Sequence, residues 1–352
     1  MKTPAILFEE INGIRLGEVT PAACGPGQIA ARTLFSFVSP GTELRMLAGH
    51  YGTAGKYPFV PGYSSIGVVT EVGAEAKGFR VGDTISCRNT CDFADCKALY
   101  GAHAGAHTLV TTGEDAPVLL PDLPNEEDYL PYATLEVAAI SLRGRIAADP
   151  KPGESCIVIG QGMIGVFSAL LFHEAGCRVV VADIDKRRLA FGRGRGYATA
   201  DLSEPDAEDR IVRLGDDGYD IVVEASGSIP GVELAFRLPR CKPPVSRHEF
   251  QVKPIHFYSH NWPRIVMQAN YLEKVSIDPW DFMEGQGVTI LTPFDRGFDE
   301  RQKMVDLIQR GAVKMDEFVS VVHKPADMVA GYRSLQNREI SALVGDWRPV
   351  GR

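Results

Sequence analysis

The middle of the chain alternates short apolar β-type runs with stretches of helical periodicity. Two apolar runs, Cys156–Ile159 and Val179–Ala182, enclose an apolar helical pattern. A third run lies at Asp220–Val223, and helical patterns cover Lys186–Gly194 and Gly231–Leu238. Strands that alternate with helices fold into a parallel, doubly wound sheet. The sequence therefore predicts an α/β domain in this region.

The first 128 residues have a different pattern, in which turn signals separate short β-type runs. Turns are expected at Gly52–Gly55 and Pro61-Gly62, and Met1–Val19 is typical of a strand with polar interruptions. The other predicted strands are Gln28–Thr33, Ser65–Glu71, Asp83–Cys87 and His107–Thr111. This spacing predicts a β-rich domain with a partly open barrel.

Prolines interrupt residues 239–295, where we expect strands at Pro254–Tyr258 and Gly287–Leu291. The segment Glu300–Gly311 is predicted to be an amphipathic helix, because its apolar residues recur at helical spacing. Further predicted elements are the helices Tyr132–Ile146 and Lys324–Leu335 and the strands Val319–Val322 and Ala342–Trp347.

A glycine-rich turn joins the first central run to its helix. Gly160 allows a tight turn out of the strand, Gly162 lets a pyrophosphate approach the backbone, and Gly165 lets the helix pack close to the sheet. The helix N-terminus, which begins with Met163 and Ile164, offers N–H groups to the phosphates. The alternative is that the glycines serve only the turn. The accompanying strand, helix, second strand and acid favour a dinucleotide-binding site.

The acid is Asp183, which lies 18 residues after Gly165. This is close to the spacing of ~20 expected for the carboxylate that binds the ribose hydroxyls. Because a carboxylate repels a 2′-phosphate, we expect NAD as cofactor rather than NADP. Lys186, Arg187 and Arg188 follow closely and weaken this expectation, since they could hold a 2′-phosphate or simply begin a solvated helix.

Size and charge restrict the class of protein. A chain of 352 residues is long for one core, so two domains are expected. The net charge of −8 argues against a nucleic-acid or membrane-surface partner, and no apolar run approaches the ~20 residues that span a bilayer. The start does not have the character of a signal peptide. A cytoplasmic enzyme that acts on a small molecule is the expectation.

The chain has seven cysteines, an odd number that fits a reducing compartment. Cys87, Cys91 and Cys96 cluster, with His103 and His107 nearby. Their spacing is not that of a standard zinc ribbon. Three thiols in an irregular loop are therefore expected, with a metal site as the alternative.

Together these features resemble the medium-chain dehydrogenase/reductase family. The anchors are Gly41-Thr42-Glu43, Val60-Pro61-Gly62-Tyr63, Ile66–Val69, Val81-Gly82-Asp83, Leu135-Glu136, the glycine turn and Glu224–Gly227. The resemblance implies a split GroES-like β-barrel catalytic domain, 1–128 and 296–352, with a Rossmann domain, 129–295, inserted in it. It also implies cofactor contacts from Ala225, Ser226 and Gly227, an active site in the interdomain cleft and a homodimer. The spacer to Tyr63 and the ending Asp346-Trp347-Arg348 further resemble the bacteriochlorophyllide a dehydrogenases.

The departures from the family pattern concern its metal. Zinc-dependent members carry Cys where this chain has Pro40, and Gly-His-Glu where it has Gly62-Tyr63-Ser64. Proline has no side-chain donor atom, serine is a poor ligand and neutral tyrosine is weak, whereas catalytic zinc needs three protein ligands. Only Glu136 offers a possible zinc ligand at a position where the family has one. We therefore expect no catalytic zinc.

Without a metal, a side chain must exchange the proton of the reacting hydroxyl. Tyr63 is the first candidate, if its pKa falls from about 10; the alternative is a structural tyrosine. Glu136 is the second, with a pKa raised by partial burial; the alternative is an ion pair. Thr42 matches the family's hydroxyl relay, and Ser64 could donate to a substrate oxygen.

Other polar residues are candidates for substrate binding. Glu43 could orient substrate or cap a short helix at Leu44–Leu47. His50 and Tyr51 could line the pocket or lie exposed on a loop. His256, His260 and Trp262 form an aromatic–imidazole group to which we assign no role.

The expected function is that of a zinc-independent, NAD-dependent dehydrogenase or ketoreductase for a secondary alcohol of a polyfunctional molecule. Polyols, cyclitols, sugars and tetrapyrrole side chains all remain open as substrates. One alternative is an NAD(P)H-dependent reductase of activated C=C bonds. Others are a non-catalytic NAD(H)-binding redox sensor and an enzyme that oxidises and then re-reduces its substrate with a retained cofactor.

Overall fold

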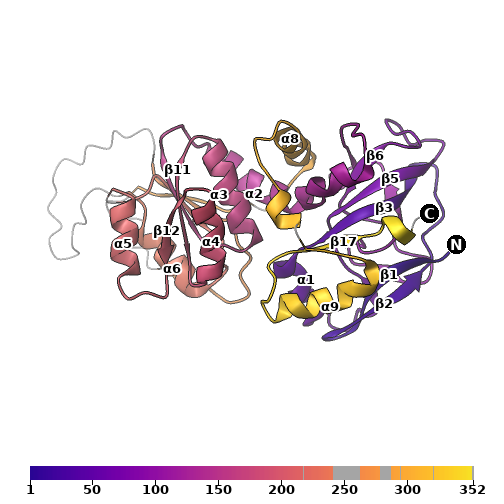
Figure 1. The fold of residues 1–352 in the computed structure, drawn as a ribbon, viewed down its shortest axis with the longest axis horizontal. Helices are drawn as coiled ribbons and strands as arrows, with labels where there is room; N and C mark the ends of the chain where they lie inside the picture. Colours follow the sequence, from indigo (N-terminus) through magenta and orange to yellow (C-terminus); the bar gives the residue numbers. More distant parts are fainter. Residues whose placement is uncertain (217, 241–261, 278–286, 294, 320, 351–352) are drawn as a thin grey trace. The chain divides into compact units, whose positions relative to one another are not determined.

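The computed structural model describes residues 1–216, 218–240, 262–277, 287–293, 295–319 and 321–350. The chain divides into two compact units, of which unit 1 comprises Met1–Ala139 and Arg296–Arg352 and unit 2 comprises Ile140–Asp295 (Figure 1). The first boundary lies later than the expected one at 128. The reason is that the 3₁₀ helix η1 (Glu126–Thr134) packs on strands of unit 1.

Unit 2 contains the parallel sheet that the central pattern predicts. Its strands lie in the order β12-β11-β10-β13-β14-β15, all neighbours being parallel. This is the strand order of a dinucleotide-binding doubly wound sheet. The strands are β10 (Ser155–Ile159), β11 (Arg178–Asp183), β12 (Ala198–Asp201), β13 (Ile221–Glu224), β14 (Arg264–Met267) and β15 (Thr289–Leu291).

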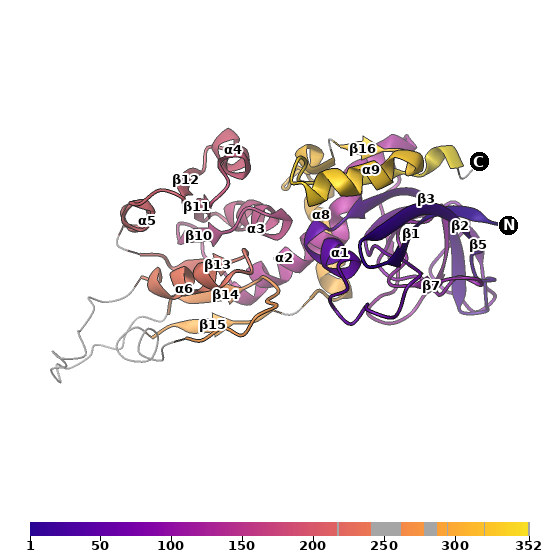
Figure 2. The same cartoon turned by 90° about the horizontal axis from the view of Figure 1, so that it is seen from below.

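Helices cover both faces of this sheet because alternate residues of each strand point to opposite faces. In β10, Ile157 and Ile159 pack in one core with helices α5 and α6, whereas Cys156 and Val158 pack in another with α3 and α4. Figure 2 shows the strands in order from β12 to β15, with α6 on one side and α3 on the other. The helices are α3 (Met163–Glu174), α4 (Lys186–Gly194), α5 (Ala207–Leu214) and α6 (Ile229–Arg237).

Unit 1 contains two sheets, with the orders β2-β1-β4-β7 and β16-β17-β3-β5-β6-β9; β8 also pairs with β3. The C-terminal strand β17 lies antiparallel against β3, so the end of the chain completes a sheet begun near its start. The strands are β1 (Thr3–Glu10), β2 (Gly13–Val19), β3 (Gln28–Val38), β4 (Phe59–Val60), β5 (Ser65–Val72), β6 (Thr84–Cys87), β7 (Lys97–Ala98), β8 (Ala106–Val110), β9 (Val118–Leu119), β16 (Val322–His323) and β17 (Leu343–Asp346).

Further helices lie within the described part of the chain. They are α1 (Pro40–Leu47), α2 (Leu135–Ala148), α8 (Phe298–Gln309) and α9 (Pro325–Gln336), with the 3₁₀ helices η2 (Asp316–Val319) and η3 (Arg348–Val350). Within the described ranges, no helix is both long and apolar enough to cross a membrane.

The predicted fold class, a GroES-like barrel with a Rossmann sheet, is confirmed. Several elements differ. The helix predicted at Leu44–Leu47 begins at Pro40, because proline suits the first helical position and Glu43 accepts the N–H of Ser39. The strand predicted at Val319–Val322 was wrong, since η2 ends at Val319 and β16 begins at Val322. The run predicted at Pro254–Tyr258 lies outside the described residues.

Candidate functional site

The glycine turn between β10 and α3 has the shape that a dinucleotide requires. Gly160 has a φ of +90°, and a Cβ there would lie 2.6 Å from the backbone nitrogen of Ser226. A Cβ on Gly165 would lie 1.7 Å from the carbonyl oxygen of Gly160. A Cβ on Gly162 would meet nothing within 4 Å. Two of the glycines are therefore needed for close packing, whereas Gly162 leaves open space above the backbone.

The N-terminus of α3 opens onto that space. Gly162 is the residue before the helix, and Met163 and Ile164, both half-buried, form its first turn. The first N–H groups of a helix have no intrahelical partner and lie at the positive end of its dipole. Together with the empty side of Gly162, they form a cradle that fits a pyrophosphate.

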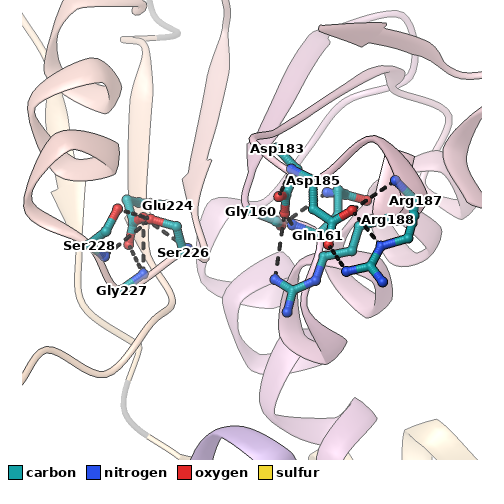
Figure 3. A network of polar contacts seen from close by, with 10 residues as sticks. All are labelled: Gly160, Gln161, Asp183, Asp185, Arg187, Arg188, Glu224, Ser226, Gly227 and Ser228. Atoms are coloured by element: carbon teal, nitrogen blue, oxygen red, sulfur yellow. Dashed lines mark hydrogen bonds and ion pairs between the residues drawn. The ribbon is translucent and has the colours of Figure 1, made fainter. Parts of the chain in front are cut away.

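Asp183, at the end of β11, is only 4% exposed and is bound to the turn (Figure 3). Its carboxylate accepts the N–H of Gln161 at 2.6 Å and that of Asp185 at 2.8 Å. Arg188 Nη1 lies 3.9 Å from the same carboxylate. Each carboxylate oxygen retains acceptor capacity, so Asp183 fixes the turn and can still accept a ribose hydroxyl.

The predicted segment after β13 lies beside the same turn. Ala225 donates its N–H to Ile159 at the end of β10. The carboxylate of Glu224 accepts the N–H groups of Ser226 at 2.9 Å and Gly227 at 3.3 Å, which holds the loop in one conformation (Figure 3). Ala225, Ser226 and Gly227 therefore lie with the glycine turn at the carboxyl ends of the strands. In open parallel sheets this is where ligands bind.

In unit 1, Tyr63 follows the Pro61-Gly62 turn and is 6% exposed. Its hydroxyl lies 2.7 Å from Ser39 Oγ, and the hydroxyl of Thr42 is close enough to influence its pKa. The guanidinium of Arg296 lies 4.9 Å from the centre of its ring. Burial raises the pKa of Tyr63, although Arg296 and the two hydroxyls lower it in part. The lowered pKa that the acid–base role requires is therefore not reached in the chain by itself, since the loss of hydration outweighs the nearby cation.

Glu136, in the first turn of α2, is fully buried, and both of its carboxylate oxygens have partners. Its Oε1 accepts from Arg301 Nε at 2.9 Å and Ser86 Oγ at 2.9 Å, and its Oε2 lies 3.4 Å from Arg296 Nε. Burial alone would raise its pKa, but the two guanidiniums lower it below the ordinary value. The predicted raised pKa was wrong, and the ion pair that the sequence left as an alternative is present.

Two further candidates serve the fold. Ser64 is buried and donates to the carbonyl oxygen of Ala133 at 2.6 Å. Glu43 is buried, and its carboxylate is hydrogen-bonded to His103 Nε2 at 2.8 Å and to the hydroxyl of Tyr332. The expected substrate contacts of Ser64 and Glu43 are not supported, because both side chains hold neighbouring elements together.

The loop after α1 carries His50 and Tyr51 near the surface. His50 is exposed, and Tyr51, with a φ of +58°, is 39% exposed. The hydroxyl of Tyr51 accepts a hydrogen bond from Arg45 at 3.0 Å. These positions match the exposed-loop alternative. His256 and His260 lie outside the described residues, and Trp262 is 39% exposed.

The three clustered cysteines are dispersed in the structure. Cys87 is buried within β6, where burial raises the pKa of its thiol to about 12. Cys91 accepts a hydrogen bond from Gln28 at 3.3 Å, and Cys96 lies 3.8 Å from the carbonyl oxygen of Pro58. Over the described ranges, no three His, Cys, Asp or Glu side chains are placed to hold a metal ion.

Sequence reasoning missed the partners of Tyr63 and Glu136. Ser39, Arg296 and Arg301 belong to no motif, and the two arginines lie more than 150 residues after Glu136 in the sequence. A buried acid must find a cation, so Glu136 in an apolar helix was the one available signal. Nothing in the local pattern could identify which arginine would reach it.

Comparisons with known proteins agree with this geometry. Residues 26–122 match the family model of the alcohol dehydrogenase GroES-like domain. The L-threonine 3-dehydrogenase of Yersinia pestis is 27% identical over 308 residues, 82% of this chain and 83% of that enzyme. The D-arabinitol dehydrogenase 1 of Uromyces fabae is 28% identical over 208 residues, 53% of this chain and 58% of that protein.

Solved structures extend the likeness to nearly the whole chain. The 2R,3R-butanediol dehydrogenase of Bacillus subtilis superposes with a TM-score of 0.78 at 18% identity. The match covers 98% of this chain and 99% of that one. At this identity the likeness establishes the fold rather than a shared substrate.

Proposed function

Because the chain belongs to the medium-chain dehydrogenase/reductase family, we propose that it interconverts a secondary alcohol and a ketone on a polyfunctional small molecule. The open side of Gly162 and the free N-terminus of α3 carry the cofactor part of the proposal. A nicotinamide cofactor, when bound, supplies the acceptor or donor of the hydride. The chain's own residues then have to bind the cofactor, orient the alcohol and move its proton.

Tyr63 is the group proposed to move that proton. Its hydroxyl is hydrogen-bonded to that of Ser39, with which it can exchange the proton. In alcohol oxidation the tyrosinate takes the proton of the substrate hydroxyl; in ketone reduction the phenol returns it. Since burial raises the pKa of Tyr63, the phenol is the resting form at neutral pH. This favours ketone reduction near neutrality and alcohol oxidation at alkaline pH.

The proposal is metal-free because of the chemistry of the side chains at the family's ligand positions. Pro40 offers no donor atom, and the Tyr63 hydroxyl is bound to the hydroxyl of Ser39. Glu136 is neutralised by Arg296 and Arg301. A catalytic zinc needs three nitrogen, sulfur or oxygen ligands that can turn toward it. These residues do not fit a zinc ion, so no step of the proposed reaction uses one.

We propose NAD as the cofactor because Asp183 keeps a carboxylate at the ribose position. Arg188, 3.9 Å from that carboxylate, partly offsets its charge and makes NADP the competitor. Titration of the purified protein with NADH and NADPH, followed by nicotinamide fluorescence, should give the lower Kd for NADH. A lower Kd for NADPH would contradict this assignment and identify Arg188 as the dominant group.

The relatives suggest the substrate class. Threonine, arabinitol and butanediol, named for three of the similar enzymes, all carry a secondary alcohol beside a second polar group. We propose a substrate of this kind for the present chain, and leave polyols, cyclitols, sugars and tetrapyrrole side chains as the panel to test. An activated C=C substrate in the same panel would reveal the competing reductase activity.

The test of the function is the variant Tyr63→Phe, which removes one oxygen and little volume. We expect kcat with the best alcohol of the panel to fall by roughly 10²–10⁴-fold, the usual contribution of a general acid or base, with the Kd for NADH unchanged. Thr90→Val, in the same unit and also the loss of one hydroxyl, is the control. Turnover in Tyr63→Phe equal to that of the unmodified protein would remove Tyr63 from the reaction.

A further inference from the structure

The hydroxyls of Tyr63 and Ser39, which lie 2.7 Å apart, come from two separate segments of unit 1. Tyr63 follows the Pro61-Gly62 turn, whereas Ser39 lies between β3 and α1. A hydrogen bond between them requires that both segments keep their places, because it weakens steeply once its geometry is lost. One side chain reaches the supports of both segments, namely the imidazole of His103, which is fully buried.

On the side of Tyr63, His103 packs against the turn that precedes the tyrosine. A Cβ on Gly62 would lie 2.5 Å from both Nε2 and Cδ2 of His103, so the ring and the turn are in close contact. The backbones are joined as well, since His103 donates its N–H to the carbonyl oxygen of Pro61 at 3.2 Å and Ala102 donates to that of Gly62 at 2.8 Å. The segment of His103 therefore fixes the turn from which Tyr63 projects.

On the side of Ser39, the imidazole acts through a buried carboxylate. His103 Nε2 lies 2.8 Å from Glu43 Oε2, and Glu43 Oε1 accepts the backbone N–H of Ser39 at 2.8 Å. Glu43 lies in α1 and, like His103, has no exposure. Hydrogen bonds in such a buried, satisfied network hold a single conformation. The imidazole therefore fixes the carboxylate, and the carboxylate fixes the backbone of Ser39.

The other edge of the imidazole is anchored to the C-terminal part of the chain. His103 Nδ1 lies 2.7 Å from Ser36 Oγ, which accepts the indole N–H of Trp347 at 2.8 Å. Tyr332 in α9 donates its hydroxyl to Glu43. One placement of protons satisfies the whole row: Trp347 donates to Ser36, the Ser36 hydroxyl donates to Nδ1, and Nε2–H donates to Glu43. The ring of His103 is thus held at both nitrogens.

We propose that His103 is a positioning residue of the proton-transfer site, because it keeps Ser39 and Tyr63 in contact. It acts on Ser39 through the carboxylate of α1, and on Tyr63 through the turn that precedes it. The inference rests on the proposed function, in which Tyr63 exchanges the substrate proton. His103 itself moves no proton in this scheme, since it is fully buried and both of its ring nitrogens are engaged within the fold.

A second buried histidine of the same unit, His107, provides the matched control. Its ring is 1% exposed, and its Nε2 lies 2.7 Å from Thr33 Oγ1. Its Nδ1 has no hydrogen-bond partner among the described residues. His107 is therefore as buried as His103 and also bound at Nε2, but its ring makes no hydrogen bond to α1 or to the Pro61-Gly62 turn in the part of the chain that the structure describes.

The test is the variant His103→Asn, whose shorter amide can take the place of Nδ1 but not that of Nε2, so the contact with Glu43 is lost. In protein labelled with ¹³Cζ-tyrosine, the NMR signal of Tyr63, assigned from Tyr63→Phe, should shift in the same direction as in Ser39→Ala. The double variant should shift by less than the sum of the two, because both changes act on one hydrogen bond. His103→Gln, whose amide reaches the place of Nε2, should restore most of the signal.

Turnover gives the second measurement. In His103→Asn we expect kcat with the best alcohol of the panel to fall by roughly 10–10²-fold, since misplacement of a reacting group by about 1 Å can cost the larger factor. KM and the Kd for NADH should stay unchanged. His107→Asn should leave both kcat and the Tyr63 signal unchanged, whatever its effect on the thermal midpoint of unfolding. If His103→Asn does not fold, Glu43→Gln, which weakens the same contact from the other side, replaces it.

The outcomes separate the inference from the function on which it rests. An unchanged Tyr63 signal in folded His103→Asn overturns the inference, whatever the turnover, and so does an equal shift in His107→Asn, which would indicate a general loosening of the barrel. A shifted signal together with full turnover in Tyr63→Phe supports the placement of Tyr63 by His103 but refutes Tyr63 as the proton-transfer group. A shifted signal and a lowered kcat, both restored in His103→Gln, support the inference and the function.

Discussion

At the residue scale, the absence of a side chain has different consequences at Gly162 and Gly165. At Gly165 a Cβ would overlap the carbonyl oxygen of Gly160, so the glycine is required by the protein's own backbone. At Gly162 the same atom would enter open space in front of a helix N-terminus. Gly165 is therefore required for folding, whereas packing within the chain does not require a glycine at position 162.

This difference predicts opposite results for two equivalent substitutions. Gly162→Ala should keep the thermal midpoint of unfolding while raising the Kd for NADH by roughly tenfold or more, because its methyl group occupies the pyrophosphate cradle. Gly165→Ala should instead lower the thermal midpoint of unfolding, because its methyl group would overlap the carbonyl oxygen of Gly160. Calorimetry and a binding titration on both variants test this. Unchanged NADH affinity in Gly162→Ala would show that the cradle holds no pyrophosphate.

Single residues were predictable from the sequence where the chemistry is local. The glycine turn could be identified because its three positions are set by neighbours within one strand and one helix. Glu136 could not be assigned, because its two cations come from the C-terminal segment, which only the folded barrel brings to α2. The pKa of a buried acid depends on such distant partners, and so the expected direction was wrong.

At the element scale, Arg301 fixes α8 to the barrel. It has no exposure, binds Glu136, and donates to the carbonyl oxygen of Ala116 at 2.7 Å. The pKa of Glu136 is lowered, so its ionised form stabilises the fold above the unfolded pKa of about 4.3. The stabilisation is lost as the pH falls through the lower pKa of the folded state.

Glu136→Gln should therefore lower the free energy of unfolding by roughly 3–5 kcal/mol at neutral pH, because two buried guanidiniums lose their carboxylate. The loss should shrink as the pH falls from about 4.3, the unfolded pKa, through the lower pKa of folded Glu136. Urea unfolding at several pH values measures both effects. Glu9→Gln is the control, since Glu9 pairs with Arg15 at the surface of the same unit. Equal, small losses in both variants would show that the buried pair is not stabilising.

Elements were predictable where periodicity is strong. Helix α4 has the bounds expected for it, and the central strands lie within a residue or two of the runs that predicted them. The helix α5 and the strand β12 were not predicted, because polar residues interrupt both. In β12, pairing with β11 determines the strand more than its own sequence does.

At the scale of the whole molecule, the candidate residues lie in two compact units. Unit 2 presents the glycine turn, Asp183 and the loop after β13, which fit a nicotinamide cofactor. Unit 1 presents Tyr63 with its hydroxyl partner Ser39 and the cluster of Glu136, Arg296 and Arg301. The residue pattern led to the glycine turn and Asp183, and the family resemblance led to Tyr63 and Glu136. The two arginines became visible only in the folded chain.

The central claim is the proposed one, that proton transfer at Tyr63 needs no catalytic zinc. The most direct measurement is the metal content of the purified, cofactor-binding protein by elemental analysis. The account predicts zinc far below one ion per chain, unchanged by growth in zinc-supplemented medium. About one zinc per chain, retained after mild chelation and lost in Glu136→Gln, would contradict it, because that ion would occupy a catalytic ligand set.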